Sequence, residues 1–155
     1  MKKNLASFLL VVCFVITTAF ASTPGVPAKV LEKMSSLYPE ATKIEWKTRH
    51  GFEASFVLKN RKGVSVFDKK GNVLYSHIDM SYWSLPMPVL QEVKNNYVVK
   101  GYVVNKVTHL QHKEKDTYDV EVARAKEIYT LRYYPNGKRV AIFNMANERK
   151  VHSKE

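Results

Sequence analysis

The chain carries one pattern twice, and this duplication limits the possible folds more than any other feature of the sequence. Each copy opens with an apolar helical segment and continues with alternating apolar residues. The matching segments are PAKVLEKMSSLY (27–38) and PMPVLQEVKNNY (86–97), GFEASF (51–56) and TYDVEV (117–122), and VFDKKGNVL (66–74) and RYYPNGKRV (132–140). The offset grows from 59 to 66 residues, so the second copy is seven residues longer. Two copies of one unit can share an extended sheet and one binding surface.

The first 21 residues have the features of a secretory signal peptide. Lys2 and Lys3 form a positively charged start, and an apolar stretch covers 5–20. Ala19-Phe20-Ala21 has the small-x-small pattern of a cleavage site. The apolar stretch is shorter than the roughly 20 residues that a membrane-spanning helix needs. We therefore expect cleavage near Ala21 and a periplasmic or secreted protein that is not transmembrane.

Cys13 is the only cysteine of the chain, and it lies inside this leader. A lipoprotein signal would place small residues directly before its cysteine, whereas Leu10-Val11-Val12 precedes Cys13. The mature chain, Ser22–Glu155, therefore has no thiol for a disulfide, a nucleophile or a cysteine metal site. Export without disulfides is typical of a bacterial periplasm or cell surface rather than of a small secreted eukaryotic domain.

The chain is basic, with 25 Lys and Arg against 14 Asp and Glu and a formal net charge of +11. Removing Lys2 and Lys3 with the leader still leaves +9. In a cytosolic protein this charge would indicate nucleic acid. An exported protein meets anionic glycans, lipid headgroups or acidic proteins instead, so we expect no nucleic-acid partner. The alternative is a basic surface that serves only solubility.

Alternation of apolar and polar residues follows each helical segment and predicts half-buried strands. Phe52, Ala54 and Phe56 share one face, with Glu53 and Ser55 on the other. The predicted strands are 42–48, 52–58, 64–67, 73–78, 102–111, 118–122, 128–134 and 139–143. The predicted fold class is α+β: a tandem repeat of a helix followed by a four-stranded antiparallel sheet. One face of each sheet lies under its helix and the other stays open.

The predicted organisation is a signal peptide (1–21), a first repeat (22–84), a second repeat (85–146) and a flexible tail (147–155). We expect both repeats to form one structural domain, because the mature length suits a single domain. The seven extra residues of the second copy fall around 112–116, in a longer hairpin.

The order of these motifs resembles a known family. Tyr38-Pro39 ends the first helix, Ile44-Glu45-Trp46 follows in a strand, and then come Phe52–Phe56 and Phe67–Gly71. This order resembles the PepSY-like, beta-lactamase-inhibitor-like family of exported bacterial proteins over essentially the whole mature chain. The second copy departs from it, with Val98 in place of Pro39, Tyr134 in place of Asp68 and a valine in place of Trp46.

The resemblance implies a beta-lactamase-inhibitor-protein-like fold, in which a tandem pair of sheets forms a concave surface and the helices lie on its back. Inhibitor proteins of this architecture grip their target enzyme with the concave face. Single-repeat relatives accompany peptidases as propeptides, which implies inhibitory or chaperoning roles. No functional residue can be transferred, because a fold does not fix a function.

The sequence offers little for catalysis or metal binding. His109 and His112 are three residues apart on a predicted strand, so they point to opposite faces and cannot hold one ion together. The remaining histidines are scattered. Glu45, Glu53, Asp119 and Glu121 lie on polar faces beside lysines, without the burial that a general acid needs. We therefore expect no enzyme, no cofactor and no metal site.

Aromatic and basic residues give the candidate binding site instead. Tyr75 alternates onto the open face, and Tyr82 and Trp83 lie in the apolar segment between the copies. Tyr, Trp and Arg dominate the energetics of protein interfaces. The candidate residues are Tyr75, Tyr82, Trp83, Lys43, Lys47, Arg132 and Arg139. The alternative for Trp83 is a structural role, in which it fills the seam between the repeats.

The sequence thus favours an exported, non-catalytic binding protein that engages another envelope or secreted protein through an open concave sheet face, as an inhibitor does. The alternative is an envelope binder of an anionic glycan, lipid or peptide. A deep pocket with convergent Arg and Lys would favour that alternative. A buried carboxylate or histidine with a strongly shifted pKa would favour a hydrolase.

Overall fold

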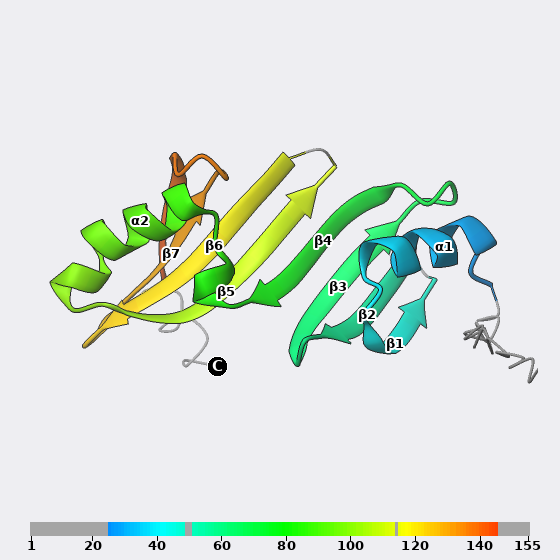
Figure 1. Cartoon of the computed structure of the whole chain (residues 1–155), viewed down its shortest axis with the longest axis horizontal. Helices are drawn as coiled ribbons and strands as arrows, with labels where there is room; N and C mark the ends of the chain where they lie inside the picture. The colour runs from blue at the N-terminus through cyan, green and yellow to red at the C-terminus, as the bar shows by residue number, and fades with distance from the viewer. Residues whose placement is uncertain (1–24, 49–50, 114, 146–155) are drawn as a thin grey trace, which may run out of the picture.

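The computed structural model describes residues 25–48, 51–113 and 115–145. The predicted signal peptide (1–21) and tail (147–155) lie outside the described residues. One helix and four strands are followed by a second helix and four strands (Figure 1). The elements are α1 (Ala28–Leu37), β1 (Thr42–Lys47), β2 (Phe52–Leu58), β3 (Arg61–Phe67), β4 (Val73–Met80), η1 (Tyr82–Ser84), α2 (Met87–Asn96), η2 (Val98–Lys100), β5 (Val103–His112), β6 (Lys115–Arg124), β7 (Glu127–Tyr133) and β8 (Arg139–Asn144). No described helix is both long enough and apolar enough to cross a membrane.

The eight strands form a single antiparallel sheet in the order β1 to β8. The α+β class is confirmed, but the sheet differs from the predicted pair of four-stranded sheets. β4 pairs with β5 without interruption, from Tyr75 opposite His112 to Met80 opposite Val107. Two separate sheets would leave the N–H and C=O groups of both inner edges unpaired. Pairing β4 with β5 satisfies these groups and joins the two halves of the chain.

Each helix covers its own four strands. α1 buries Val30 and Met34 against β2 and β3, and α2 buries Val89 and Val93 against the second set of strands. The first core consists of Val30, Met34, Ala54, Phe56 and Phe67, and the second of Leu85, Val89, Val93, Val107, Val120, Val122, Leu131 and Tyr133. We call α1 to β4 the first half and α2 to β8 the second half.

Both helices pack on the same face of the sheet. Ala54 of the first core lies opposite Ser65, and Ser65 lies opposite Ser76 of β4. Alternation along β4 places Met80 on the same side as Ser76, and Met80 packs against the second core. The other face of the sheet is therefore turned away from both α1 and α2 (Figure 1).

In each half, a turn that contains glycine packs against the first turn of the helix. Gly71 and Gly137 have φ values of +86° and +84°, which residues with a side chain adopt at a cost. A Cβ atom on Gly71 would lie 2.8 Å from the Lys29 carbonyl oxygen, and one on Gly137 would lie 3.0 Å from the Pro88 carbonyl oxygen. Only a glycine therefore lets either turn approach the first turn of its helix so closely.

Candidate binding surface

The open face is the face of the sheet that lies opposite α1 and α2. Tyr75 and His112 face each other across β4 and β5 on this side, and Thr108 faces Asp119 across β5 and β6. The alternation of each strand assigns the other open-face residues. The surface is built on sheet strands, so its side chains are held by the backbone ladder rather than by loops.

The centre of the open face holds a shallow cavity of about 160 Å³. Four neighbouring strands, β4 to β7, contribute its walls. The lining residues are His77, Lys106, Thr108, Leu110, Asp119, Glu121 and Thr130. Both charge signs and one leucine are present, which makes the cavity amphipathic rather than a pocket for one kind of ion.

Ion pairs fix the acidic groups around this cavity. Lys106 Nζ lies 3.1 Å from Asp79 Oδ1, and the Thr108 hydroxyl donates to the same oxygen at 3.2 Å. Arg132 donates from Nε and Nη2 to the two Asp119 oxygens, each at 2.7 Å. The bond to Asp119 raises the pKa of the guanidinium. Bidentate pairs of this kind have a defined geometry, so the Arg132 and Asp119 side chains hold each other in place on this face.

Sequence reasoning did not single out most of these residues. Asp119 and Glu121 were predicted to lie on a polar face but were interpreted as ordinary surface charges. Lys106, Thr108 and Leu110 share alternating positions of one strand, and that alternation was the available signal. It could not show that β4 and β7 bring further side chains to the same place, because strand register is a tertiary property.

Three of the predicted site residues lie on the open face. Tyr75 is 40% exposed in β4, and Arg132 lies in β7 with its guanidinium 5.3 Å from the centre of the Phe143 ring. Lys47 lies in the edge strand β1, with Nζ 3.6 Å from Glu53 Oε1. These residues are spread along the sheet and do not converge on one point.

Arg139 lies on the helix-covered side, contrary to the expectation that it faces outward with Arg132. Its Nη1 donates to the Tyr97 hydroxyl at the end of α2, at 3.1 Å. The cause is an irregularity in the β7–β8 pairing, where Arg139 pairs with Tyr133 while Ala141 pairs with Arg132. An extra residue at such a bulge reverses the alternation of the strand.

Lys43 is exposed, but it lies in an irregular part of β1. Its φ is +51°, and the pairing of β1 with β2 shifts between Thr42 and Glu45. The irregularity interrupts the alternation, so the sequence pattern does not assign this side chain to either face.

Tyr82 and Trp83 have different environments although they are adjacent in η1. Tyr82 packs against the second core, and burial raises the pKa of its hydroxyl. Trp83 is 79% exposed, with its ring centre 5.1 Å from that of Tyr82. The aromatic ring in the seam between the halves is therefore that of Tyr82, and Trp83 is available at the surface.

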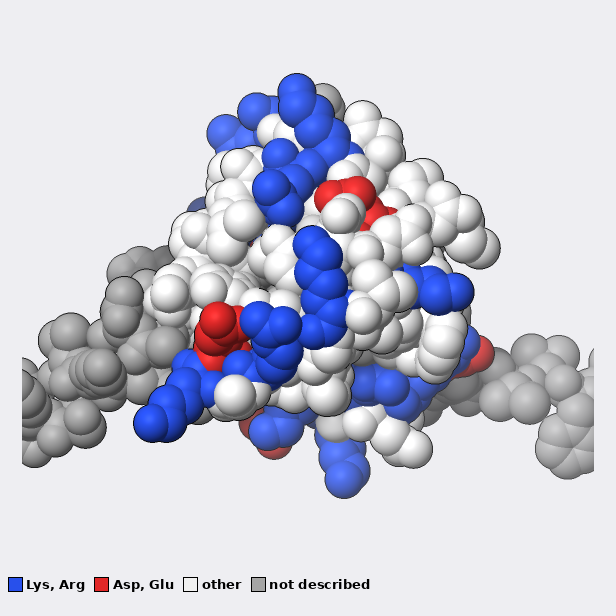
Figure 2. Space-filling model, turned by 90° about the vertical axis from the view of Figure 1, so that its left-hand side faces the viewer, with Lys and Arg blue, Asp and Glu red and all other residues white. Residues whose placement is uncertain are grey.

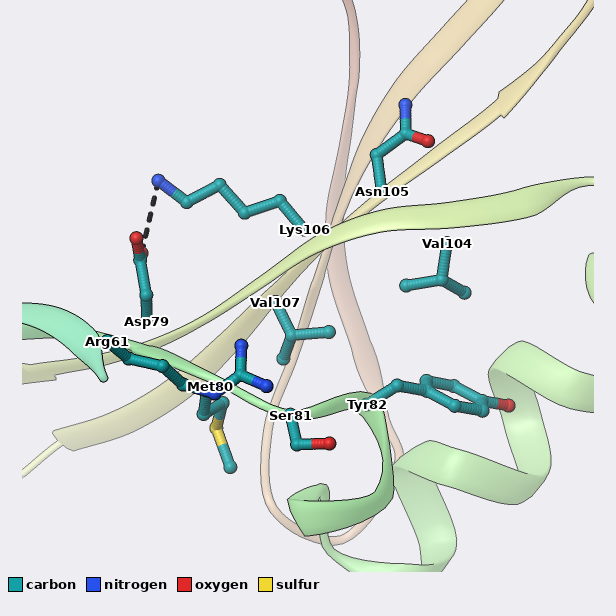
Figure 3. A pocket seen from close by; sticks show the side chains of 9 residues that line it. All are labelled: Arg61, Asp79, Met80, Ser81, Tyr82, Val104, Asn105, Lys106 and Val107. Carbon is teal, nitrogen blue, oxygen red and sulfur yellow. Dashed lines mark ion pairs between the residues drawn. The ribbon is translucent and has the colours of Figure 1, made fainter. Parts of the chain in front are cut away.

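A second cavity, of about 360 Å³, lies beside η1 where the two halves meet (Figure 3). Figure 3 shows Arg61 reaching in from β3 and Lys106 turned towards Asp79. The remaining lining residues are Met80, Ser81, Tyr82, Val104, Asn105 and Val107. Lys106 and Asp79 line this cavity as well, so their ion pair connects the junction with the open face.

The histidines of β5 lie on opposite faces of the sheet. His109 Nε2 lies 3.0 Å from Asp116 Oδ1, and its ring stacks on Tyr118 with centroids 4.9 Å apart. His112 points to the opposite face of the sheet, since it pairs with Tyr75. Among the described residues, no three His, Cys, Asp or Glu side chains are grouped closely enough to hold a metal ion.

Solved structures match this fold over most of the chain. One is a candidate periplasmic protein of Bacteroides eggerthii DSM 20697, with a TM-score of 0.60, 20% identity, and coverage of 79% of this chain and 91% of that chain. A BLIP-like protein of Bacteroides fragilis NCTC 9343 has a TM-score of 0.60 and 22% identity, with coverages of 78% and 88%. A DUF2874 family protein of Bacteroides ovatus ATCC 8483 has a TM-score of 0.59 and 21% identity, with coverages of 78% and 89%.

These likenesses define the fold of the chain. No protein-family model and no curated protein matches the sequence. The chain shares the architecture of the BLIP-like and DUF2874 structures, and this agrees with the inhibitor-protein-like fold that the sequence resemblance implies. At such low identity the agreement concerns the fold alone.

Proposed function

We propose that this chain is an exported, non-catalytic binding protein that engages a protein partner through its open face, as an inhibitor does. The observation that carries the proposal is the open face itself: both helices cover the opposite side, and ion pairs order the charged groups around its central cavity. Ordered surfaces lose less conformational entropy on binding than flexible ones, which favours association.

The size and character of the face favour a macromolecular partner. The central cavity of about 160 Å³ is smaller than the roughly 300–1,000 Å³ of typical small-ligand pockets; the cavity of about 360 Å³ falls within that range, but it lies beside η1 and not at the centre of the face. Tyr75, Arg132 and Phe143 add aromatic and guanidinium groups elsewhere on the same face, and such groups are enriched in interface hot spots. We also include Trp83, which lies in η1 at the junction of the halves rather than on a strand of the open face, because it is 79% exposed and tryptophan is enriched in interface hot spots.

The proposal includes the organisation expected from the sequence. Residues 22–84 and 85–146 are two copies of one helix-plus-four-strand unit of the PepSY-like, beta-lactamase-inhibitor-like kind, preceded by a signal peptide that directs the chain to the periplasm or the exterior. The matching helix–strand order of the halves and their glycine turns support the duplication. The name of the Bacteroides fragilis structure, BLIP-like, supports the inhibitor-like role.

The test uses the mature chain, Ser22–Glu155, immobilised and exposed to envelope and secreted extract at moderate salt. Bound proteins are identified by mass spectrometry for the wild type and for Tyr75→Ala and Trp83→Ala. We expect one dominant partner, weaker capture by both variants and stabilities within about 0.5 kcal/mol of the wild type, as for surface substitutions. Loss of several degrees of melting temperature would instead mean that these rings stabilise the fold.

A further inference from the structure

One end of the molecule combines exposed valines with basic side chains. Val98 and Val99 belong to η2, and Val103 begins β5; Val99 and Val103 are each 66% exposed. The surrounding basic residues, all exposed, are Lys94, Lys100, Arg124 and Lys126. Figure 2 views this end, where Lys and Arg side chains outnumber Asp and Glu. We call η2, Val103 and the turn between β6 and β7 the basic tip.

The basic tip is held together by its own side chains. Arg124 Nη1 donates to the Lys100 carbonyl at 3.0 Å, and the guanidinium carbon lies 4.5 Å from the centre of the Tyr102 ring. Glu127 receives hydrogen bonds from Arg124 and from the Tyr102 hydroxyl. Gly101, with φ of +83°, turns the chain from η2 into β5. These contacts fix η2 against the β6–β7 turn and leave the valines facing outward.

Apolar side chains held outward among lysines are suited to a membrane surface. Each lysine or arginine close to an anionic leaflet raises the membrane partition coefficient of a protein about fivefold. Apolar side chains add affinity by entering the boundary between headgroups and acyl chains. We propose that the basic tip docks on an anionic phospholipid surface, with Val99 and Val103 inserted and the lysines against the phosphates. An anionic glycan would engage the lysines but would give the valines no apolar environment.

At the corresponding end the first half has exposed basic residues, Lys59, Arg61 and Lys62, at its β2–β3 turn, but among its described residues no large apolar side chain is as exposed as Val99 and Val103. The connection between α1 and β1 contains Pro39 and Glu40, and the Glu40 carboxylate pairs with Lys59 at 3.2 Å. Exposed lysines do occur elsewhere in this half: Lys69 and Lys70 lie in the β3–β4 turn. These two lysines provide a control in which the same charge is removed away from the tip.

The experiment measures co-sedimentation of the mature chain with vesicles of phosphatidylglycerol and phosphatidylethanolamine, and with phosphatidylcholine vesicles, at low salt. We expect the chain to bind the vesicles that contain phosphatidylglycerol and to bind the phosphatidylcholine vesicles only weakly. Lys100→Gln with Lys126→Gln should lower the partition coefficient about 25-fold, from about fivefold per lysine. Val99→Ser with Val103→Ser should lower it about 15-fold, because about one methyl-sized group of each valine inserts. Lys69→Gln with Lys70→Gln should bind like the wild type.

Three results would overturn the proposal. Equal binding to phosphatidylcholine would remove the electrostatic basis, and equal losses in the tip and control lysine variants would show a non-specific charge effect. Weaker vesicle binding by the lysine variant, together with unchanged binding by the valine variant, would indicate an anion-binding surface, such as one for a glycan. All substituted side chains are exposed, so unchanged melting temperatures serve as the folding control.

Discussion

The two halves of the molecule fill the space under their helices with opposite choices of side-chain size. In the first half the paired residues of β2 and β3 are Phe56 and Gly63, and at the same place in the second half they are Val122 and Tyr129. A Cβ atom on Gly63 would lie 2.6 Å from the Phe56 ring. The large ring thus lies on β2 in the first half and on β7, the equivalent of β3, in the second half. The combined volume of the paired side chains, and not the size of either one, fills the space under the helix.

The halves also differ in the polarity of the next pair of strands. Ser65 faces Ser76 in the first half, where the second half has Leu131 facing Ile142. The Ser65 hydroxyl donates to the Tyr38 hydroxyl at 3.0 Å, whereas Ser76 Oγ is buried without a hydrogen-bond partner among the described residues. The second half also buries an unpartnered hydroxyl, that of Tyr133, so among the described residues the two halves differ in this serine pair and not in the presence of such a group.

The largest expected effect tests the Phe56–Gly63 pair. Phe56→Ala should cost about 3–5 kcal/mol of unfolding free energy, because it leaves a cavity under α1. Gly63→Ala alone should cost about 1–3 kcal/mol through its clash with the ring. In the Phe56→Ala background the clash is gone, so Gly63→Ala should cost almost nothing. Urea unfolding of the four proteins measures this coupling, and additive costs would contradict the paired-volume account.

A smaller effect separates the two buried serines. Ser65→Ala should cost about 1 kcal/mol, since it removes the hydrogen bond to Tyr38. Ser76→Ala should be neutral or stabilise the protein by up to about 1 kcal/mol, because an unpaired buried hydroxyl carries a desolvation penalty. The two variants serve as controls for each other in thermal unfolding. Equal losses of stability in both variants would mean that the Ser76 hydroxyl has a hydrogen-bond partner in solution.

The smallest effect concerns pH and the Asp68 turn of the first half. The Asp68 carboxylate accepts hydrogen bonds from the backbone and side chain of Asn72 and from the Lys70 amide, and these bonds lower its pKa. Because the pKa of Asp68 is lower in the folded state than its unfolded-state value of about 3.9, the ionised carboxylate stabilises the fold above about pH 3.9. This stabilisation is lost as the pH falls through the folded-state pKa. The equivalent turn of the second half has Tyr134 in place of Asp68. There the Lys138 amide donates to the side-chain oxygen of Asn136, which carries no charge.

Amide hydrogen exchange between about pH 5 and pH 2 would measure this difference at Gly71 and Gly137. After correction for the intrinsic pH dependence of exchange, protection at Gly71 should fall below about pH 4 while protection at Gly137 stays constant. Asp68→Ala should remove the pH dependence at Gly71. A parallel fall at both glycines would show that global unfolding, and not the Asp68 carboxylate, sets the response.

The sequence was sufficient to predict the order of elements and most side-chain faces. Alternation in 52–58 placed Ala54 and Phe56 in the core, where the structure has them. The sequence did not predict that β3 begins at Arg61, because the turn between Leu58 and Arg61 uses Lys59 and Asn60 at positive φ instead of a glycine.

The candidate site was harder to predict, because it depends on register between strands. The open-face cavity draws on four strands, and the pairing of β4 with β5 has no local sequence signal. One bulge reversed the expected side of Arg139. Exposure of Tyr75 followed from its position in the alternation, whereas exposure of Trp83 depends on how η1 packs.

The most direct test of the open-face account is site-specific photo-crosslinking in envelope extract. Benzoyl-phenylalanine replaces Tyr75 on the open face in one protein and Tyr134, in the turn beside α2, in another; the native side chains are 40% and 38% exposed. We predict a discrete crosslinked protein from position 75 and none from position 134. Crosslinking only from position 134, equal crosslinking from both, or none from position 75 would contradict the claim that the open face binds a protein partner.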